Sequence, residues 1–317
     1  MKLSFDQIKG ITAGAVRIWE ENDRIRFAKF TQKQTDAWYA LDTVLGERAE
    51  SSTGIRLDFY TNSSFFAFTV AKGKFYDIYV NGILSYLVTP ESLSDGRFSI
   101  SLNTSKGENR VTLVLPSHEP GALYSVELDD GATLTPHALG KKILFIGDSI
   151  TQGWEAKYNS LCYAQRVARF FNADSLIQAV GGGFFDESIL DEELDFDPEI
   201  VIVALGTNDW SRGDRATLSG KMNAFFNKLI KQYGDKKIFS ITPIWRANYN
   251  EIRNGMTFED IIALVREQAT SHGVTVIDGI PMVPHIPEFF SDGYLHPNDL
   301  GFGIYAENLI RVLKDYI

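Results

Sequence analysis

The stretch Ile143-Leu144-Phe145-Ile146-Gly147-Asp148-Ser149 decides the fold of this chain, because a short apolar run ends directly in a polar turn. A run of this length and composition is typical of a strand that is buried on both faces. Similar runs follow at residues 175–180, 199–205, 237–242 and 274–278, and segments with helical spacing alternate with them, at residues 160–171, 218–233, 258–272 and 300–316. This alternation predicts a flavodoxin-like three-layer α/β/α fold with five parallel strands in the order 2-1-3-4-5.

The residues upstream of this stretch follow a different pattern, in which apolar side chains recur at every second position. Residues 76–80 alternate in this way, and Asn81-Gly82 follows them before a second alternating run. Asn-Gly between two such runs is a strong hairpin signal, because a type I′ turn needs a positive φ at both central residues. A second pair of strands is expected between residues 98–102 and residues 111–115.

The length and composition suit two globular domains. The chain has 317 residues, of which 44% are hydrophobic and 23% charged, and these proportions argue against long disorder. We predict a β-sandwich domain over residues 1–138, which is an all-β antiparallel sandwich or jelly roll. The α/β domain is predicted to follow over residues 139–317.

The charge balance and the single cysteine restrict the possible partners and location. The chain carries 41 acidic and 31 basic residues, a formal charge of −10, so we expect neither a nucleic-acid partner nor an anionic membrane surface. We find no apolar run long enough for a transmembrane helix and no signal peptide. Cys162 is the only cysteine, which excludes an intrachain disulfide and Cys-based zinc sites. We therefore expect a cytoplasmic protein, whose oligomeric state the sequence leaves open.

Polar and glycine-rich segments follow several of the predicted parallel strands. Gly147-Asp148-Ser149 follows the first, Gly181-Gly182-Gly183 the second and Gly206-Thr207-Asn208-Asp209 the third. Asp292 and His296-Pro297-Asn298 precede the last helix. Sites in such folds form at the carboxyl ends of the strands, so we expect these segments to meet there.

These four segments, in this order, resemble the sequence blocks of the SGNH/GDSL hydrolase superfamily of esterases and acylhydrolases. Gly147-Asp148-Ser149 looks like the nucleophile block, Gly182 the glycine block, Gly206-Thr207-Asn208-Asp209 the asparagine block and His296-Pro297-Asn298 the histidine block. The resemblance covers residues 141–317. The N-terminal half more loosely resembles the β-sandwich domain that some bacterial members carry, including certain carbohydrate esterases.

The resemblance implies that Ser149 is a nucleophile, activated by His296. A serine hydroxyl needs such a base to remove its proton, and His296 is the histidine that precedes the final helix with an aspartate nearby. The implied donors to the oxyanion are the N–H groups of Ser149 and Gly182 and the side-chain amide of Asn208. Gly181 and Gly183 are alternative positions for the glycine donor.

Asp292 is the candidate that orients the imidazole of His296. The family usually places this aspartate three residues before the histidine, whereas here it lies four before, with Gly293 following it. Gly293 supplies the backbone freedom that the extra residue needs. The alternative is that a backbone carbonyl orients the ring, which would leave a Ser–His dyad.

Other interpretations of the same polar residues are weaker. Asp148, Asp209, Asp292 and His296 form a possible set of metal ligands, but the neighbouring hydroxyl and amide groups suit acyl transfer better. We therefore expect no metal and no cofactor. A nucleotide site is disfavoured because the chain has neither Gly-x-Gly-x-x-Gly nor a P-loop lysine.

The expected function is that of a serine esterase acting on short acyl esters, acetyl above all, carried by a small molecule or an oligosaccharide. Trp210, Trp245 and Arg246 follow or neighbour strand ends and are predicted to line the substrate pocket, with ordinary packing as the alternative. A lysophospholipase or thioesterase is the alternative enzyme. A non-catalytic carbohydrate-binding protein is the alternative of another class.

Overall fold

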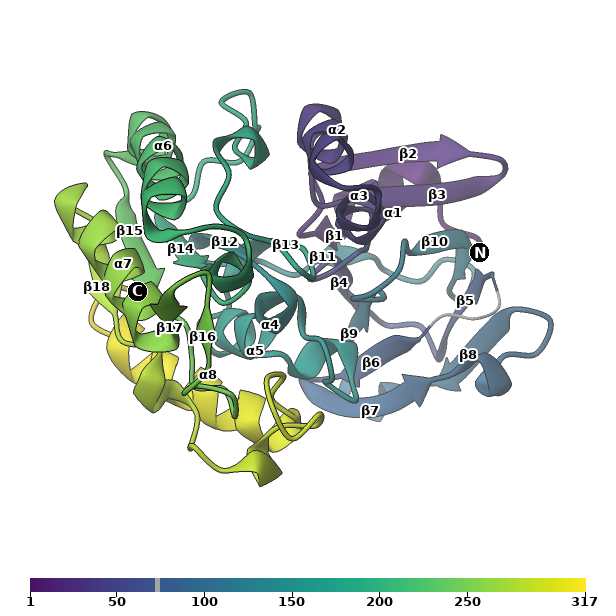
Figure 1. The fold of residues 1–317 in the computed structure, drawn as a ribbon. Helices are drawn as coiled ribbons and strands as arrows, with labels where there is room; N and C mark the ends of the chain where they lie inside the picture. Colours follow the sequence, from purple (N-terminus) through teal and green to yellow (C-terminus); the bar gives the residue numbers. More distant parts are fainter. Residues whose placement is uncertain (72–74) are drawn as a thin grey trace. The chain divides into compact units, whose positions relative to one another are not determined.

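The structure is a computed structural model that describes residues 1–71 and 75–317, and its contacts divide the chain into two compact units (Figure 1). Unit 1 comprises Met1–Phe30, Glu50–Leu139 and Tyr158–Ser160, and unit 2 comprises Thr31–Ala49, Gly140–Lys157 and Leu161–Ile317. The units separate near residue 140, where the hydrophobic period changes. The units differ from the predicted domains at residues 31–49, which belong to unit 2 although they lie within the predicted N-terminal domain of residues 1–138.

Unit 1 contains two antiparallel sheets. The strands of the first, in spatial order, are β1 (Thr12–Ala13), β4 (Arg56–Thr61), β9 (Asn109–Val114), β6 (Tyr76–Val80) and β7 (Ile83–Val88), with β11 (Thr135–Pro136) also pairing with β4. The strands of the second are β2 (Arg17–Glu21), β3 (Arg24–Ala28), β10 (Ala122–Glu127), β5 (Phe65–Val70) and β8 (Arg97–Ser101). Leu57 and Leu113 of the first sheet and Phe66 and Val126 of the second share one buried core. This is the predicted all-β antiparallel sandwich.

The hairpin predicted at Asn81-Gly82 joins β6 and β7, with φ of 51° and 81° at the two turn residues. The other predicted pair is wrong. β8 pairs with β5 and β9 pairs with β4 and β6, so the connection through residues 102–108 passes from one sheet to the other. Alternation shows that each segment is a strand with one buried face, but it does not show which sheet holds it. The short helices of unit 1 are α1 (Phe5–Gly10), η1 (Pro90–Ser92) and η2 (Thr104–Lys106).

Unit 2 is built on one parallel sheet. Its strands, in spatial order, are β13 (Asp174–Ala179), β12 (Lys142–Gly147), β14 (Ile200–Ala204), β15 (Lys237–Ile241) and β18 (Thr275–Ile277), which is the order 2-1-3-4-5 along the chain. The inner strands carry continuous Ile, Val, Leu and Phe because both of their faces are buried. A small hairpin is formed by β16 (Ile252–Arg253) and β17 (Met256–Thr257).

Helices cover both faces of this sheet (Figure 1). α5 (Tyr163–Phe170) and α8 (Asp299–Leu313) pack together over Phe145 and Ile202, and α6 (Arg215–Tyr233) packs with α7 (Phe258–Ser271). The remaining helical segments of unit 2 are α4 (Ser149–Gln152), η4 (Glu187–Ile189), η5 (Asp209–Ser211), η6 (Ile280–Met282) and η7 (Pro287–Phe289). One further turn, η3 (Asn159–Leu161), has its first two residues in unit 1 and its last in unit 2. Among the described residues, no helix is long and apolar enough to cross a membrane.

The segment of residues 31–49 forms two helices, α2 (Gln32–Leu41) and α3 (Thr43–Ala49). Thr31 and Gln34 make a capping box that starts α2. The helix is then fixed to the rest of unit 2: the side chains of Gln34 and Gln178 exchange two buried hydrogen bonds of 2.9 and 3.0 Å, and Asp191 accepts from Thr31 at 2.7 Å. Buried polar groups with complete hydrogen bonds specify one docking position, so this segment completes unit 2.

Candidate active site

Ser149 lies at the carboxyl end of β12, as the first residue of the short helix α4. Asp148 precedes it as the helix N-cap, and its Oδ1 accepts the N–H of Ile150 at 2.9 Å. As the first helical residue, Ser149 has no intrahelical acceptor for its own N–H. The tight turn from β12 into α4 therefore places both the hydroxyl and the N–H of Ser149 at this edge of the sheet.

Three of the predicted residues form a hydrogen-bonded chain. Ser149 Oγ lies 2.9 Å from His296 Nε2, and His296 Nδ1 lies 2.8 Å from Asp292 Oδ2. A carboxylate facing Nδ1 favours the tautomer with its proton there, which leaves Nε2 free to accept a proton from the serine. The geometry thus joins a hydroxyl, a base and an orienting carboxylate in the order that nucleophilic catalysis requires.

The loop between Asp292 and His296 explains how four-residue spacing still gives this contact. Asp292 Oδ1 accepts the N–H groups of Tyr294, Leu295 and His296 at 2.9, 2.7 and 3.1 Å, and Gly293 has a φ of +66°. The carboxylate is therefore the centre of a turn that folds the extra residue back. Partial burial raises the pKa of Asp292, but these hydrogen bonds and the one from His296 outweigh it and hold the pKa below its usual value.

The three glycines after β13 differ in what their N–H groups do. The N–H of Gly181 donates to Gln152 Oε1 at 2.6 Å, and that of Gly183 donates to the carbonyl of Val180 at 2.8 Å. Among the described residues, the N–H of Gly182 donates to no acceptor. Of the three candidates from the sequence, Gly182 therefore has the N–H that remains available to a ligand.

Asn208 lies beside this glycine turn. Its Nδ2 donates one hydrogen to the carbonyl of Gly183 at 2.9 Å, and its second amide hydrogen is not required by that bond. The next residue, Asp209, is buried, and its Oδ1 accepts the N–H of Phe185 at 3.1 Å. Asn208 thus links the loop after β14 to the loop after β13.

Asp148 and Asp209 are both buried carboxyl groups below the site. The pKa of each is raised to about 7, mainly by burial, while hydrogen bonds from backbone N–H groups act in the opposite direction. The proximity of Asp209 contributes to the raised pKa of Asp148. Neither joins a set of metal-ligating side chains: in residues 1–71 and 75–317 no three His, Cys, Asp or Glu residues gather as a metal site would require. The two aspartates fix loops, as their hydrogen bonds show.

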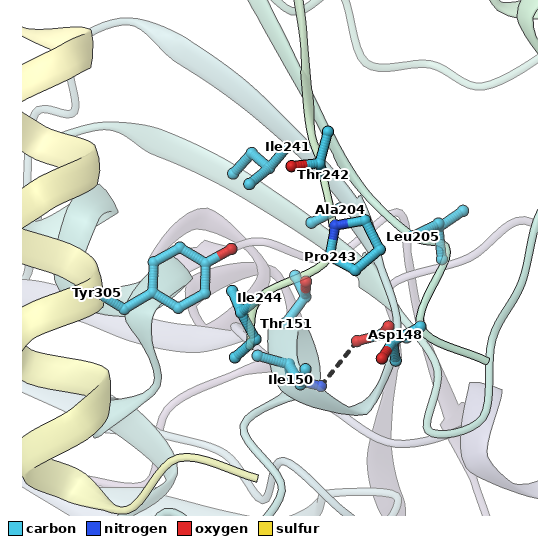
Figure 2. A pocket seen from close by; sticks show the side chains of 11 residues that line it. Asp148, Ile150, Thr151, Ala204, Leu205, Ile241, Thr242, Pro243, Ile244 and Tyr305 are labelled. Atoms are coloured by element: carbon cyan, nitrogen blue, oxygen red, sulfur yellow. Dashed lines mark hydrogen bonds between the residues drawn. The ribbon is translucent and has the colours of Figure 1, made fainter. Parts of the chain in front are cut away.

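A small cavity lies under the nucleophile turn, with Asp148, Thr151, Thr242 and Tyr305 in its wall (Figure 2). Tyr305 of α8 directs its hydroxyl toward it. Its volume is about 20 Å³, and a single water needs roughly 10–15 Å³ on the same measure. This cavity is therefore too small to receive an ester substrate.

The three residues predicted to line a substrate pocket lie in different environments. Trp210 is fully buried, and its Nε1 donates to the carbonyl of Met256 at 2.8 Å. Arg246 is 3% exposed and lies over the rings of Trp210 and Tyr294, and burial lowers the pKa of its guanidinium. Both residues are therefore buried in this structure, and their place in a substrate pocket stays a prediction. Trp245 is half-buried and stacks on His285 with ring centroids 5.6 Å apart.

Arg48 lies near the glycine turn and was not predicted from the sequence. Arg48 of α3 donates from Nη1 to the carbonyl of Gly181 at 2.9 Å, and its guanidinium lies 4.6 Å from the ring centroid of Trp154. The ring of Trp154 lies 6.1 Å from that of His296. The capping-box sequence from Thr31 to Gln34 could have predicted a helix, but no signal near Arg48 connects it with a glycine turn so distant in sequence.

The chain matches the GDSL-like lipase/acylhydrolase family over residues 145–304, about half of its length. A curated relative, an acetylxylan esterase of Xylanibacter ruminicola, is 25% identical over 210 residues. The match covers 55% of this chain and 43% of that relative, so it spans less than half of the relative's length.

Two solved structures are similar over nearly the whole chain. The salicylyl-acyltransferase SsfX3 from a tetracycline biosynthetic pathway has a TM-score of 0.80 at 21% identity, with 96% of this chain and 94% of that one covered. A family two carbohydrate esterase from Cellvibrio japonicus has a TM-score of 0.70 at 17% identity, with 99% and 97% covered. At these identities the likeness shows a common fold.

Proposed function

Because the chain belongs to the GDSL-like lipase/acylhydrolase family, we propose that it is a serine esterase that hydrolyses short acyl esters, acetyl above all, on carbohydrates. The observation that carries this proposal is the chain of hydrogen bonds from Ser149 through His296 to Asp292, at 2.9 and 2.8 Å. A serine hydroxyl aligned on an oriented imidazole is the minimal apparatus for forming an acyl-enzyme.

In the proposed reaction, Ser149 Oγ attacks the ester carbonyl carbon while His296 Nε2 takes the hydroxyl proton. The tetrahedral intermediate collapses, the C–O bond to the alcohol breaks, and His296 returns the proton to the departing alkoxide. Water then attacks the acyl-enzyme, His296 accepts its proton and gives it to Ser149, and the free acid leaves. Asp292 holds the ring and stabilises the imidazolium without taking the proton.

The negative charge on the former carbonyl oxygen is proposed to be met by three donors. These are the N–H of Ser149 at the start of α4, the N–H of Gly182 and the side-chain amide of Asn208. Their availability supports the assignment, because the N–H groups of Gly181 and Gly183 are already occupied. Each such donor typically lowers the barrier by about 3–4 kcal/mol.

The carbohydrate ester is proposed on two grounds. The acetylxylan esterase of Xylanibacter ruminicola is a relative of this chain, and the family two carbohydrate esterase of Cellvibrio japonicus has the same fold. A fold alone does not select a substrate, so the acyl group and the alcohol need a direct test.

Labelling and hydrolysis together test the proposal. A fluorophosphonate should modify Ser149, and Ser149→Ala should abolish release of acetate from acetylated xylo-oligosaccharides. Ser211→Ala is the matched control, because Ser211 is exposed and its side chain accepts a bond from Arg253 on the protein surface. Label on another serine, or activity retained in Ser149→Ala, contradicts the mechanism.

Hydrolysis and binding measurements distinguish this esterase from the alternative functions. A series of p-nitrophenyl esters of increasing chain length should show the highest kcat/KM with acetate. A preference for long chains would indicate a lysophospholipase or thioesterase. Binding of oligosaccharides without hydrolysis would indicate a non-catalytic carbohydrate-binding protein.

A further inference from the structure

The proposed oxyanion donor Gly182 belongs to a run of three glycines, which have the most freedom of any backbone to rotate a peptide plane. Gly182 itself has a φ of +85°, in the left-handed region. Rotation of the peptide between Gly181 and Gly182 would replace the N–H with a carbonyl oxygen and turn an attractive group into a repulsive one. Something outside the glycine run must therefore hold this peptide in one orientation.

The contacts of Arg48 meet this requirement. Arg48 Nη1 donates to the carbonyl of Gly181 at 2.9 Å, and that carbonyl belongs to the same peptide unit as the N–H of Gly182. A Cβ on Gly182 would lie 3.3 Å from Arg48 Nη1, so the guanidinium lies directly against this peptide. The bond fixes the carbonyl end of the peptide and thereby the direction of its N–H end.

Arg48 is itself held in place. Its guanidinium lies over Trp154, whose Nε1 donates to Gln152 Oε1 at 3.2 Å, and the same oxygen accepts the N–H of Gly181. Among the described residues no carboxylate forms an ion pair with Arg48. The positive charge is therefore directed at the Gly181 carbonyl, where it also polarises the peptide and strengthens its N–H as a donor.

We propose that Arg48 is a positioning residue for the oxyanion site: it holds the Gly181–Gly182 peptide so that the N–H of Gly182 points at the reacting oxygen. This inference rests on the proposed esterase function. It assigns a role in the reaction to a helix that lies outside the residues matched by the family, 145–304.

The neighbouring arginine provides a matched comparison. Arg212 donates from Nη2 to the carbonyl of Gly182 at 3.3 Å and lies 3.8 Å from the ring centroid of Phe184. The peptide that it contacts carries the N–H of Gly183, which is already bonded to Val180. Loss of the Arg212 charge therefore changes the local field but not the peptide that presents the oxyanion donor.

The test is a series of full-length variants, Arg48→Lys, Arg48→Gln and Arg48→Met, with Arg212→Gln for comparison. Loss of an oxyanion donor lowers kcat by about 10²–10³, and loss of its anchor should cost roughly ten- to a hundredfold in Arg48→Met with KM nearly unchanged. Arg48→Lys keeps a charged donor but loses the planar group that lies over Trp154, so its kcat should lie between those of the wild type and Arg48→Met. Arg212→Gln should lose less than about threefold.

A ketone pair separates positioning from general damage to the fold. Ser149 Oγ adds to the carbonyl carbon of an aryl trifluoromethyl ketone and forms a tetrahedral oxyanion. The affinity for this ketone should therefore decrease in proportion to kcat/KM across the Arg48 variants. The methyl ketone stays neutral, and its affinity should not change. Equal kcat in wild type and Arg48→Met, or equal loss of affinity for both ketones, would overturn the inference. Absence of esterase activity in the wild type would instead remove the proposed function on which it rests.

Discussion

Replacement of Asp292 by asparagine should lower kcat strongly while the loop keeps its structure, because the two carboxylate oxygens of Asp292 bind different groups. Oδ1 accepts three backbone N–H groups, at 2.7–3.1 Å. Among the described residues, Oδ2 accepts only from His296, through its Nδ1 at 2.8 Å and weakly through its N–H at 3.3 Å. In Asp292→Asn the amide oxygen should keep the Oδ1 position, since only an oxygen can accept those three bonds. The NH₂ group must then face Nδ1 of His296.

An NH₂ group in that position requires Nδ1 to act as an acceptor. The ring proton of His296 must then sit on Nε2, which faces Ser149 Oγ at 2.9 Å and can no longer take the serine proton. The equivalent change in the serine-protease triad costs about 10⁴-fold in kcat, or about 5.4 kcal/mol of transition-state stabilisation. We expect a loss of about 10³–10⁴-fold here, with KM little changed.

Steady-state hydrolysis of p-nitrophenyl acetate at neutral pH measures this effect, and thermal unfolding checks that the loop survives. Asp299→Asn is the control: Asp299 Oδ1 accepts the N–H of Lys157 at 2.9 Å, which an amide oxygen can also do, so kcat should stay within about twofold. A loss of less than about tenfold in Asp292→Asn, with His296→Ala inactive, would refute the reasoning. It would mean that a backbone carbonyl or the loop itself orients the ring.

Three further substitutions test the fold around the site. Gly182→Ala should lower the free energy of unfolding by about 1–2 kcal/mol, because φ is +85° there. The variant keeps the backbone N–H, but its Cβ would lie 3.2 Å from Leu45 Cδ2 and 3.3 Å from Arg48 Nη1, so relief of this crowding should turn the N–H away from the reacting oxygen and lower kcat about tenfold or more. Urea unfolding and kinetics measure both effects, and an unchanged kcat would contradict a role for the orientation of this peptide in the reaction. Asp209→Asn tests the buried carboxyl whose pKa is raised to about 7, mainly by burial. Between about pH 4 and pH 7 the folded protein binds more protons at Asp209 than the unfolded chain does, so the free energy of unfolding of the wild type should fall with rising pH relative to that of the variant. Urea unfolding at both ends of this range measures it, and an equal difference between wild type and variant at the two pH values would contradict the prediction. Gln34→Ala removes the two buried hydrogen bonds between Gln34 and Gln178 and should cost about 1–3 kcal/mol in urea unfolding. An unchanged midpoint would show that residues 31–49 dock by other contacts.

The parallel sheet of unit 2 could be predicted because its signals are local. Each inner strand, such as β12 and β14, is a continuous apolar run, since both faces are buried by helices. The glycine and polar residues at the strand ends then meet at one edge by topology alone. This rule locates the segments that contain Ser149, Gly182 and Asn208, and the resemblance to the SGNH/GDSL superfamily then selects these residues within them.

Long-range packing was beyond the same reasoning. The sequence placed Trp210 and Arg246 near strand ends, but it did not indicate that each would turn inward, one to the carbonyl of Met256 and the other over aromatic rings. A position next to a strand end fixes where the backbone of a residue lies. Whether its side chain is buried depends on what the following loop packs against. The pairing partners of β8 and β9 in unit 1 were missed for the same reason.

Arg48 shows what a motif can leave out of a catalytic apparatus. A glycine turn is favoured at an oxyanion site because the backbone must approach the reacting atoms closely, but the same freedom leaves the peptide without a preferred orientation. The orientation must then come from donors elsewhere, here Arg48 at the carbonyl of Gly181, Arg212 at that of Gly182 and Asn208 at that of Gly183. Asn208 lies within the matched residues and Arg48 does not. The docking of residues 31–49, which brings Arg48 to this carbonyl, is therefore part of the proposed oxyanion site.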